Sequence, residues 1–222
     1  MPAPDSVEDT RTTGDLFEGT DQPLGPGAAL LRGFARDCAA DLIAAANGVI
    51  ARAPLRHMVT PGGLEMSVAM TNCGPLGWVS DRRGYRYQAH DPLSGDPWPE
   101  MPGLFRSLAQ GAAERAGFPD FMPDACLINR YLPGTRLSLH QDRDETDFGA
   151  PIVSVSLGLP AVFLFGGLRR ADRPRRLGLE HGDVVVWGGA SRLVYHGVAP
   201  LASGVHPALG GQRFNLTFRK AT

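Results

Sequence analysis

From residue 125 onward, short apolar runs are separated by glycine, proline and charged residues. β-Branched and aromatic residues dominate these runs, and several runs alternate apolar with polar positions, which is typical of strands. Six segments are predicted as strands on this basis: ACLINRY (125–131), IVSVSLGL (152–159), AVFLF (161–165), DVVVW (183–187), RLVYHGV (192–198) and QRFNLTFR (212–219). Three shorter strand-like pieces precede them: MSVAMT (66–71), GWVS (77–80) and YRY (85–87).

Two segments show helical periodicity instead. The first runs from about 37 to 53, with Asp37 as the expected N-cap, and it stops at Pro54. The second begins near Pro102 and ends before Gly117. Two helices followed by a run of strands, without alternation of strand and helix, exclude a doubly wound sheet. The pattern predicts a mainly β (α+β) chain, a sandwich or jelly roll backed by helices.

Length and composition fit one globular domain behind a polar arm. The chain has 222 residues, of which 43% are hydrophobic and 20% charged. Residues 1–27 are acidic and rich in proline and glycine, which predicts a flexible arm, and residues 28–222 then form the domain. The net charge is −1, but residues 1–21 hold six acids and one base, which leaves 17 acids and 21 bases elsewhere. Charge therefore neither supports nor excludes a nucleic-acid partner.

Cysteine usage and hydropathy indicate a cytoplasmic protein without membrane association. Cys38, Cys73 and Cys126 are an odd number, widely spaced, which argues against a disulfide framework and a cysteine zinc site. The first thirty residues lack the apolar segment of a signal peptide. The uncharged stretch 148–168 contains prolines, glycines and alternating serines, so it is predicted to form two strands and a turn rather than a membrane helix.

The first candidate for chemistry is the segment HQD at 140–142. On an extended backbone, residues i and i+2 point to the same side, so His140 and Asp142 can bind one metal ion. His196 would complete the two-histidine, one-carboxylate set of non-haem Fe(II) oxygenases. The pair His-x-Asp also arises by chance, and HGD at 181–183 is a second instance, placed where a turn residue is expected. From the residues alone, metal binding and a chance match at 140–142 remain equally good interpretations.

The C-terminal strand combines an apolar face with a polar one. Four polar side chains share one face: Arg213, Asn215, Thr217 and Arg219. Guanidinium groups bind planar carboxylates through two parallel hydrogen bonds, so Arg213 and Arg219 could engage both ends of a dicarboxylate. The alternative is an amphipathic edge strand with solvated arginines. Asn129 and Tyr131 add hydrogen-bonding groups with the same period on the segment 125–131.

With these motifs the chain resembles the AlkB-type Fe(II)/2-oxoglutarate dioxygenases, which reverse alkylation damage in DNA. The matching stretches are MVTPGG (58–63), SVAMTNCG (67–74), PDACLINRYLPG (123–134), LSLHQDRDE (137–145), PIVSVSLGLPAVF (151–163), LEHGDVVVWGG (179–189), YHGV (195–198) and RFNLTFR (213–219). The resemblance implies a double-stranded β-helix (jelly roll) with supporting N-terminal helices. It further implies a nucleotide-recognition lid at about 66–90 and an iron and cosubstrate core at about 123–219.

The resemblance also implies roles for particular residues. Three side chains are expected to bind Fe(II): His140, Asp142 and His196. Five are expected to bind 2-oxoglutarate: Asn129, Tyr131, Arg213, Asn215 and Arg219. Within this set, the resemblance puts Arg213 on the distal carboxylate and Arg219 near the 1-carboxylate, and O₂ is the further reactant.

For the substrate, the resemblance implies five contact residues: Met70, Trp78, Tyr85, Asp144 and Arg170. Trp78 would stack on the flipped base opposite His140, and Met70 would belong to the lid. Tyr85 would contact the nucleic-acid backbone, while Asp144 and Arg170 would border the base pocket. The plainer alternatives are a core position for Trp78 and an ordinary strand aromatic for Tyr85.

The implied activity is oxidative demethylation of 1-methyladenine and 3-methylcytosine in single-stranded DNA by a monomeric enzyme. Double-stranded DNA and RNA are further candidate substrates, and the products would be formaldehyde, succinate and CO₂. Two other functions stay open. A 2-oxoglutarate-dependent hydroxylase of a small molecule or protein side chain would not need Trp78, Tyr85 or the basic segment 169–176. A non-catalytic cupin-like binding module would not need the arginine pair on the last strand.

Overall fold

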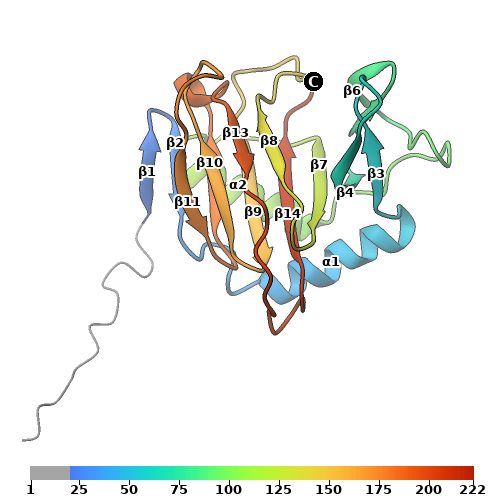
Figure 1. Cartoon of the computed structure of the whole chain (residues 1–222), viewed down its shortest axis with the longest axis horizontal. Coiled ribbons are helices and arrows are strands. Elements are labelled where there is room, and N and C mark those ends of the chain that lie inside the picture. The colour runs from blue at the N-terminus through green and yellow to red at the C-terminus, as the bar shows by residue number, and fades with distance from the viewer. Residues whose placement is uncertain (1–20) are drawn as a thin grey trace, which may run out of the picture.

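The computed structural model describes residues 21–222, and over these residues two antiparallel sheets lie face to face (Figure 1). The larger sheet has eight strands, in the spatial order β1 (Gln22–Gly25), β2 (Ala28–Leu31), β12 (Val184–Trp187), β9 (Ile152–Gly158), β14 (Arg213–Arg219), β7 (Ala125–Tyr131), β4 (Glu65–Cys73) and β3 (Arg56–Val59). The smaller sheet has four: β11 (Arg175–Leu179), β10 (Ala161–Phe165), β13 (His196–Val198) and β8 (Leu137–His140). The predicted jelly roll is confirmed.

Two helices cover the outer face of the larger sheet, as predicted. They are α1 (Ala39–Arg52) and α2 (Gly103–Arg115). Their buried apolar residues form one core with the even-numbered side chains of β14, and the rings of Phe105 and Phe218 meet edge to face, with centroids 5.8 Å apart. The prediction of Asp37 as the N-cap is wrong, because the first hydrogen bond of the helix runs from the N–H of Leu42 to the carbonyl of Cys38. Cys38 is therefore the N-cap.

The polar face of β14 lies inside the protein. All seven residues from Arg213 to Arg219 are buried, because β14 is hydrogen-bonded to β7 on one side and to β9 on the other. The odd-numbered side chains of this strand point into the space between the two sheets, opposite the face that packs on the helices. The alternative of a solvated edge strand is therefore wrong, and this strand positions the site described below.

Two of the predicted strand boundaries change. Only His196–Val198 of the predicted strand 192–198 is extended, because the N–H groups of Arg192 and Val194 bond to nearby carbonyls in turns. Strand β1 (Gln22–Gly25) lies within the segment assigned to the arm, because four residues that include a proline and a glycine give no strand signal. Residues 1–20 of the predicted arm lie outside the described residues.

The segment predicted as a lid divides into two parts. Strand β4 is an interior strand of the larger sheet, where its residues Ala69–Cys73 pair with β7 and β3 lies on its other side, so it cannot act as a cover. Only β5 (Gly77–Asp81) and β6 (Gly84–Gln88) form a separate two-stranded hairpin, on the right in Figure 1.

The uncharged stretch 148–168 forms β9 and β10, as predicted. Neither helix in the described residues has the length and apolar character needed to cross a membrane.

Candidate metal and cosubstrate site

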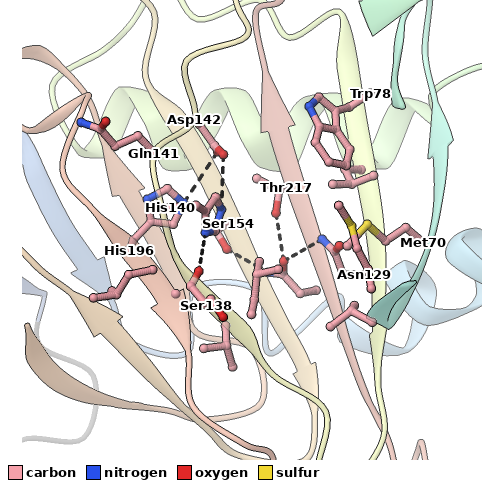
Figure 2. Close-up of a pocket in the computed structure, with 18 of the residues that line it drawn as sticks. Met70, Trp78, Asn129, Ser138, His140, Gln141, Asp142, Ser154, His196 and Thr217 are labelled. Carbon is pink, nitrogen blue, oxygen red and sulfur yellow. Dashed lines mark hydrogen bonds and ion pairs between the residues drawn. The ribbon is translucent and has the colours of Figure 1, made fainter. Parts of the chain in front are cut away.

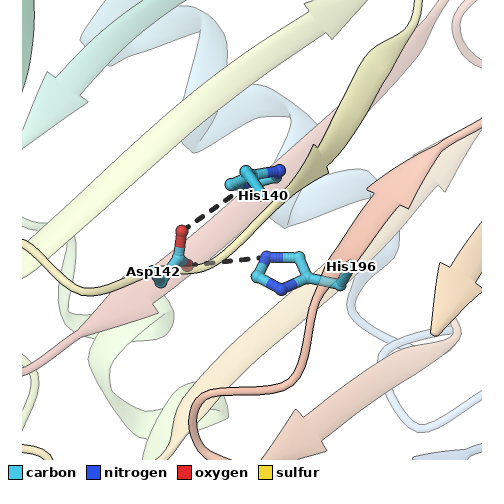
Figure 3. Close-up of side chains that lie close together, drawn as sticks. All are labelled: His140, Asp142 and His196. Atoms are coloured by element: carbon cyan, nitrogen blue, oxygen red, sulfur yellow. Dashed lines mark ion pairs between the residues drawn. The ribbon is translucent and has the colours of Figure 1, made fainter. Parts of the chain in front are cut away.

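Two histidines and one aspartate converge between the sheets (Figure 3). His140 ends β8 and His196 begins β13, and the two are direct register partners, which brings their ring centroids to 4.3 Å. Asp142 follows β8 by two residues, with Oδ1 3.5 Å from Nε2 of His140 and Oδ2 3.8 Å from Nε2 of His196. We call these three residues the metal triad. Their ligand atoms lie within 4.8 Å of one another, close enough for one metal ion.

A hydrogen bond to a backbone carbonyl fixes the orientation of each imidazole. Nδ1 of His140 lies 2.9 Å from the carbonyl of Ser138, and Nδ1 of His196 lies 3.1 Å from the carbonyl of Val194. Because a carbonyl can only accept, each Nδ1 carries a proton, and Nε2 is the nitrogen that remains to bind a metal. Burial lowers the pKa of His196 to about 3, so this imidazole is neutral near pH 7.

Asp142 is held as a carboxylate. Burial alone would raise its pKa, but the Arg219 guanidinium outweighs burial and holds the pKa well below its usual range. Nε and Nη2 of Arg219 lie 2.8 and 2.7 Å from Oδ2 of Asp142. The expectation that Arg219 lies near the 1-carboxylate of 2-oxoglutarate stays a prediction, and in this structure its partner is Asp142.

The metal triad lines a cavity of about 770 Å³ that extends between the sheets to the hairpin (Figure 2). Residues from β4, β7 and β14 line it on the larger sheet, and residues from β8, β10 and β13 line it on the smaller one. The volume is typical of a pocket for a small ligand. Every residue expected to bind iron, 2-oxoglutarate or the nucleotide lines this one cavity, so the structure brings together all thirteen.

The Arg213 guanidinium is buried in the cavity wall and has few hydrogen-bond partners. Its side chain is 1% exposed, and Nη2 donates to the hydroxyl of Ser156 at 2.9 Å. Nε and Nη1 find no hydrogen-bond partner among the described residues, and the guanidinium lies 4.9 Å from the centroid of the Tyr131 ring. Burial lowers the pKa of Arg213. A buried guanidinium without an acidic partner is costly, and a ligand carboxylate would supply the missing acceptors.

The side-chain amides of Asn129 and Asn215 line the cavity beside Arg213. We call this polar surface of the larger sheet the floor of the cavity. Nδ2 of Asn215 donates to the hydroxyl of Ser154 at 2.8 Å and to the carbonyl of Val155 at 3.0 Å. Nδ2 of Asn129 donates to Oδ1 of Asn215 at 3.2 Å, while Oδ1 of Asn129 is buried without a partner in the described part of the chain. Figure 2 shows Asn129 and Ser154 on this floor, between Met70 and the metal triad.

The hairpin brings aromatic side chains to the cavity mouth. Trp78 of β5 and Tyr85 of β6 are stacked, with ring centroids 5.5 Å apart and planes 13° apart. Trp78 is half-buried and lines the cavity, and its Nε1 donates to Oδ2 of Asp144 at 2.8 Å. Tyr85 is 46% exposed. Neither is a core residue, so the plainer alternative of a buried core tryptophan is not what the structure has.

Two other expected substrate contacts, Met70 and Arg170, lie outside the hairpin. Met70 is 2% exposed on β4, opposite Asn129 of β7, so it belongs to the cavity floor rather than to a lid. Arg170 lines the cavity, donates to the carbonyl of Leu139 at 2.6 Å and lies over the ring of Tyr195. The basic segment 169–176 is not one continuous loop, because Arg175 and Arg176 begin β11.

The second His-x-Asp pair has a structural role, as expected. His181 lies in a turn, where its Nδ1 accepts a hydrogen bond from the backbone N–H of Gly158 at 2.9 Å. Asp183 is buried and forms a 2.7 Å ion pair with Arg32. Both residues of this pair therefore have partners of their own and do not line the cavity.

Sequence reasoning missed several residues around Asp142. Arg192 and Glu145 form a buried ion pair of 3.0 Å behind Asp142, and Tyr87 donates to Glu145. Trp187 packs on His196 with ring centroids 4.8 Å apart. The charged residues at 142–145 lie next to a predicted metal ligand and could have drawn attention to Glu145. Its partner Arg192 is distant in sequence, and no local pattern around it indicates the ion pair.

The residues of the cavity fit an iron and 2-oxoglutarate site. Two imidazoles and one carboxylate form the donor set of non-haem Fe(II) enzymes that leave other coordination positions open. The buried Arg213 guanidinium, which lacks an acidic partner in the described chain, fits the far carboxylate of a dicarboxylate. The sequence-based expectations of the metal and the cosubstrate thus meet in one cavity.

Comparison with known proteins agrees with this geometry. The model of the 2OG-Fe(II) oxygenase superfamily matches residues 27–219. The chain is 61% identical over 210 residues to the alpha-ketoglutarate-dependent dioxygenase AlkB of Escherichia coli K12, covering 93% of this chain and 97% of that protein. It is 34% identical over 123 residues to the nucleic acid dioxygenase ALKBH1 of Homo sapiens, covering 55% of this chain and 31% of that protein.

Among solved structures, OsALKBH1 matches with a TM-score of 0.79 at 31% identity, covering 90% of this chain and 100% of the other. The superfamily model and the 61%-identical relative each span nearly the whole described chain. The metal triad and the match to alpha-ketoglutarate-dependent dioxygenases together show that the enzyme uses Fe(II) and 2-oxoglutarate. The chain belongs to the 2OG-Fe(II) oxygenase superfamily and, within it, to the AlkB family of dioxygenases.

Proposed function

We propose that this enzyme oxidatively demethylates N-alkylated bases, 1-methyladenine and 3-methylcytosine, in nucleic acid. The observation that carries the proposal is one cavity with three parts: the metal triad at its centre, the buried Arg213 on its floor and the stacked Trp78–Tyr85 pair at its mouth. A cosubstrate acid, a metal and a flat substrate can therefore meet in the same space.

The metal triad would hold Fe(II), which with 2-oxoglutarate and O₂ would supply the hydroxylation of an alkyl carbon, and the resulting hydroxymethyl base would lose formaldehyde. The protein binds and orients the reactants. Arg213 binds the distal carboxylate of the cosubstrate, and Asn129 and Asn215 line its path toward the metal triad. The Trp78 indole and the His140 imidazole, both on the cavity wall, hold the base so that its alkyl group faces the metal.

The aromatic pair favours a nucleic-acid substrate over a small molecule or a protein side chain. A base in a duplex must leave the stack to enter the cavity, and unpairing costs a few kcal/mol, so we expect single strands to be preferred over double strands. The human relative is named a nucleic acid dioxygenase, and RNA is accordingly a second candidate substrate. The three free cysteines fit the reducing cytoplasm. We expect a monomer, since one chain supplies the metal triad, Arg213 and the aromatic pair of the cavity.

Substitution of Trp78 tests the nucleic-acid substrate. Trp78→Ala removes a stacking contact worth about 1–3 kcal/mol, so affinity for a methylated single-stranded oligonucleotide should fall roughly 10- to 100-fold. Trp78→Phe should recover much of the loss, because stacking needs an aromatic face rather than the indole N–H. Fluorescence anisotropy measures the binding, and a thermal melt of each variant reports folding.

The other functions give different results in the same experiment. A hydroxylase of small molecules shows no specific oligonucleotide binding in the wild type. If Trp78 mainly supports the fold, both variants melt early and lose oligonucleotide binding together with 2-oxoglutarate turnover. With Fe(II) at saturating concentration, turnover of 2-oxoglutarate without oligonucleotide should survive in both variants under our proposal, since Trp78 is not a member of the metal triad and its indole N–H bonds to Asp144.

A further inference from the structure

The hairpin is attached to the segment that follows Asp142 through two adjacent carboxylates. Trp78 and Tyr87 lie directly opposite each other on β5 and β6. Nε1 of Trp78 donates to Asp144 at 2.8 Å, and the hydroxyl of Tyr87 donates to Oε1 of Glu145 at 2.6 Å. The two acceptors follow Asp142 by two and three residues, so the hairpin is fixed to the chain segment that carries a member of the metal triad.

Besides Tyr87, Glu145 contacts two arginines, Arg192 and Arg219. It is 5% exposed, and its Oε2 forms a 3.0 Å ion pair with Arg192, whose side chain is 3% exposed. Its Oε1, which accepts from Tyr87, also lies 3.4 Å from Nε of Arg219. One buried carboxylate thus contacts the hairpin and two buried guanidinium groups.

Both of these arginines hold Asp142. Nη1 of Arg192 donates to the backbone carbonyl of Asp142 at 2.7 Å, and Nε and Nη2 of Arg219 bind its carboxylate. Asp142, Glu145, Arg192 and Arg219 therefore form a buried cluster of two negative and two positive charges. In this cluster Arg192 fixes the backbone of Asp142 and Arg219 fixes its side chain.

The shared guanidinium gives Glu145 influence over metal binding. Charges interact strongly when they are buried, and removing one member of such a set leaves an uncompensated partner. Without the charge of Glu145, Arg192 loses its acidic partner, and Arg219 retains Asp142 as its remaining carboxylate within the cluster. Arg219 then competes more strongly with a metal ion for the oxygen of Asp142. Groups that hold a ligand in this way commonly tune metal affinity.

We propose that Glu145 is a positioning residue that couples the docked hairpin, through Tyr87, to the orientation of Asp142. Such coupling is reciprocal, so docking of the hairpin strengthens metal binding and a bound metal strengthens docking. That the hairpin touches the substrate rests on the proposed function, whereas its coupling to the metal does not. The coupling is therefore measured without oligonucleotide.

The test is the affinity of the metal-free full chain for Mn(II), measured by titration calorimetry well below the melting temperature. Glu145→Gln keeps the shape of the side chain and removes its charge, and should weaken Mn(II) binding roughly 10- to 100-fold. The matched control is Asp91→Asn, which removes the charge of another buried carboxylate, ion-paired at 2.7 Å with Arg56 and outside the cavity lining. It should lower the melting temperature but leave Mn(II) affinity unchanged.

Tyr87→Phe isolates the hairpin link, because it removes one hydroxyl and leaves all four charges. We expect Mn(II) affinity to fall about fivefold or more, the lower end of typical coupling between sites. The double variant should bind Mn(II) no more weakly than Glu145→Gln alone. Unchanged affinity in Tyr87→Phe overturns the proposal, and so does an equal loss in Asp91→Asn.

If Glu145→Gln does not fold, Tyr87→Phe decides alone. Failure to demethylate an oligonucleotide, with Mn(II) coupling intact, would refute the proposed function and leave this inference standing.

Discussion

The His140→Ala variant is expected to lose metal-dependent activity to background while keeping its fold. The substitution deletes one of the three donor atoms of the metal triad. It should cost little stability, because the side chain is 34% exposed and its hydrogen bond is a single contact with the carbonyl of Ser138. Succinate formation measures activity, calorimetry with Mn(II) measures metal binding, and a thermal melt reports the fold.

His181→Ala is the matched control, since His181 belongs to the second His-x-Asp pair and its hydrogen bond is to Gly158. Metal binding and activity should survive this change. Asp142→Ala is a less clean test, because it leaves the buried Arg219 with one partner fewer, and breaking such a pair costs about 3–5 kcal/mol. Loss of metal binding in His181→Ala with retention in His140→Ala would refute the metal triad.

The second large effect is expected for Arg213→Ala, which should raise the KM for 2-oxoglutarate by roughly 30-fold or more. Truncating one partner of a buried, hydrogen-bonded charge pair costs about 2–5 kcal/mol, and each 1.4 kcal/mol is a factor of ten. Without cosubstrate, Nε and Nη1 of Arg213 have no partner among the described residues. Its removal should therefore affect cosubstrate binding far more than folding.

Steady-state kinetics over a range of 2-oxoglutarate concentrations, together with thermal melts, check this prediction. Arg213→Lys retains the charge but not the two parallel hydrogen bonds, and should recover part of the affinity. The melting temperature of Arg213→Ala should rise clearly when 2-oxoglutarate is raised about 100-fold above the new KM, where binding adds about 2.7 kcal/mol of stability. An unchanged KM would return Arg213 to a purely structural role.

Local periodicity explains which parts of the site could be predicted from sequence. The alternation in 213–219 is a property of one strand, so its two faces were predictable, and so was the shared side of His140 and Asp142. The choice between a solvated edge and a buried centre was not, because it depends on β7 and β9, which are distant in sequence.

The cluster around Glu145 had no comparable signal. Glu145 and Arg192 are 47 residues apart, and Arg192 lies in a turn that the apolar pattern predicted as strand. The edge strand β1 was missed for a related reason: four residues with a proline and a glycine carry too little periodicity, and their pairing with β2 decides the outcome. Partners supplied by tertiary contact lie beyond sequence patterns.

Formaldehyde release from a single-stranded oligonucleotide that carries 1-methyladenine or 3-methylcytosine tests the central claim most directly. With Fe(II), O₂ and 2-oxoglutarate, the enzyme should release one formaldehyde for each methyl group removed, alongside succinate. Without 2-oxoglutarate, or with the His140→Ala variant, release should fall to background. Succinate formation that is independent of the methylated oligonucleotide, with no formaldehyde, would contradict the account and indicate a different substrate.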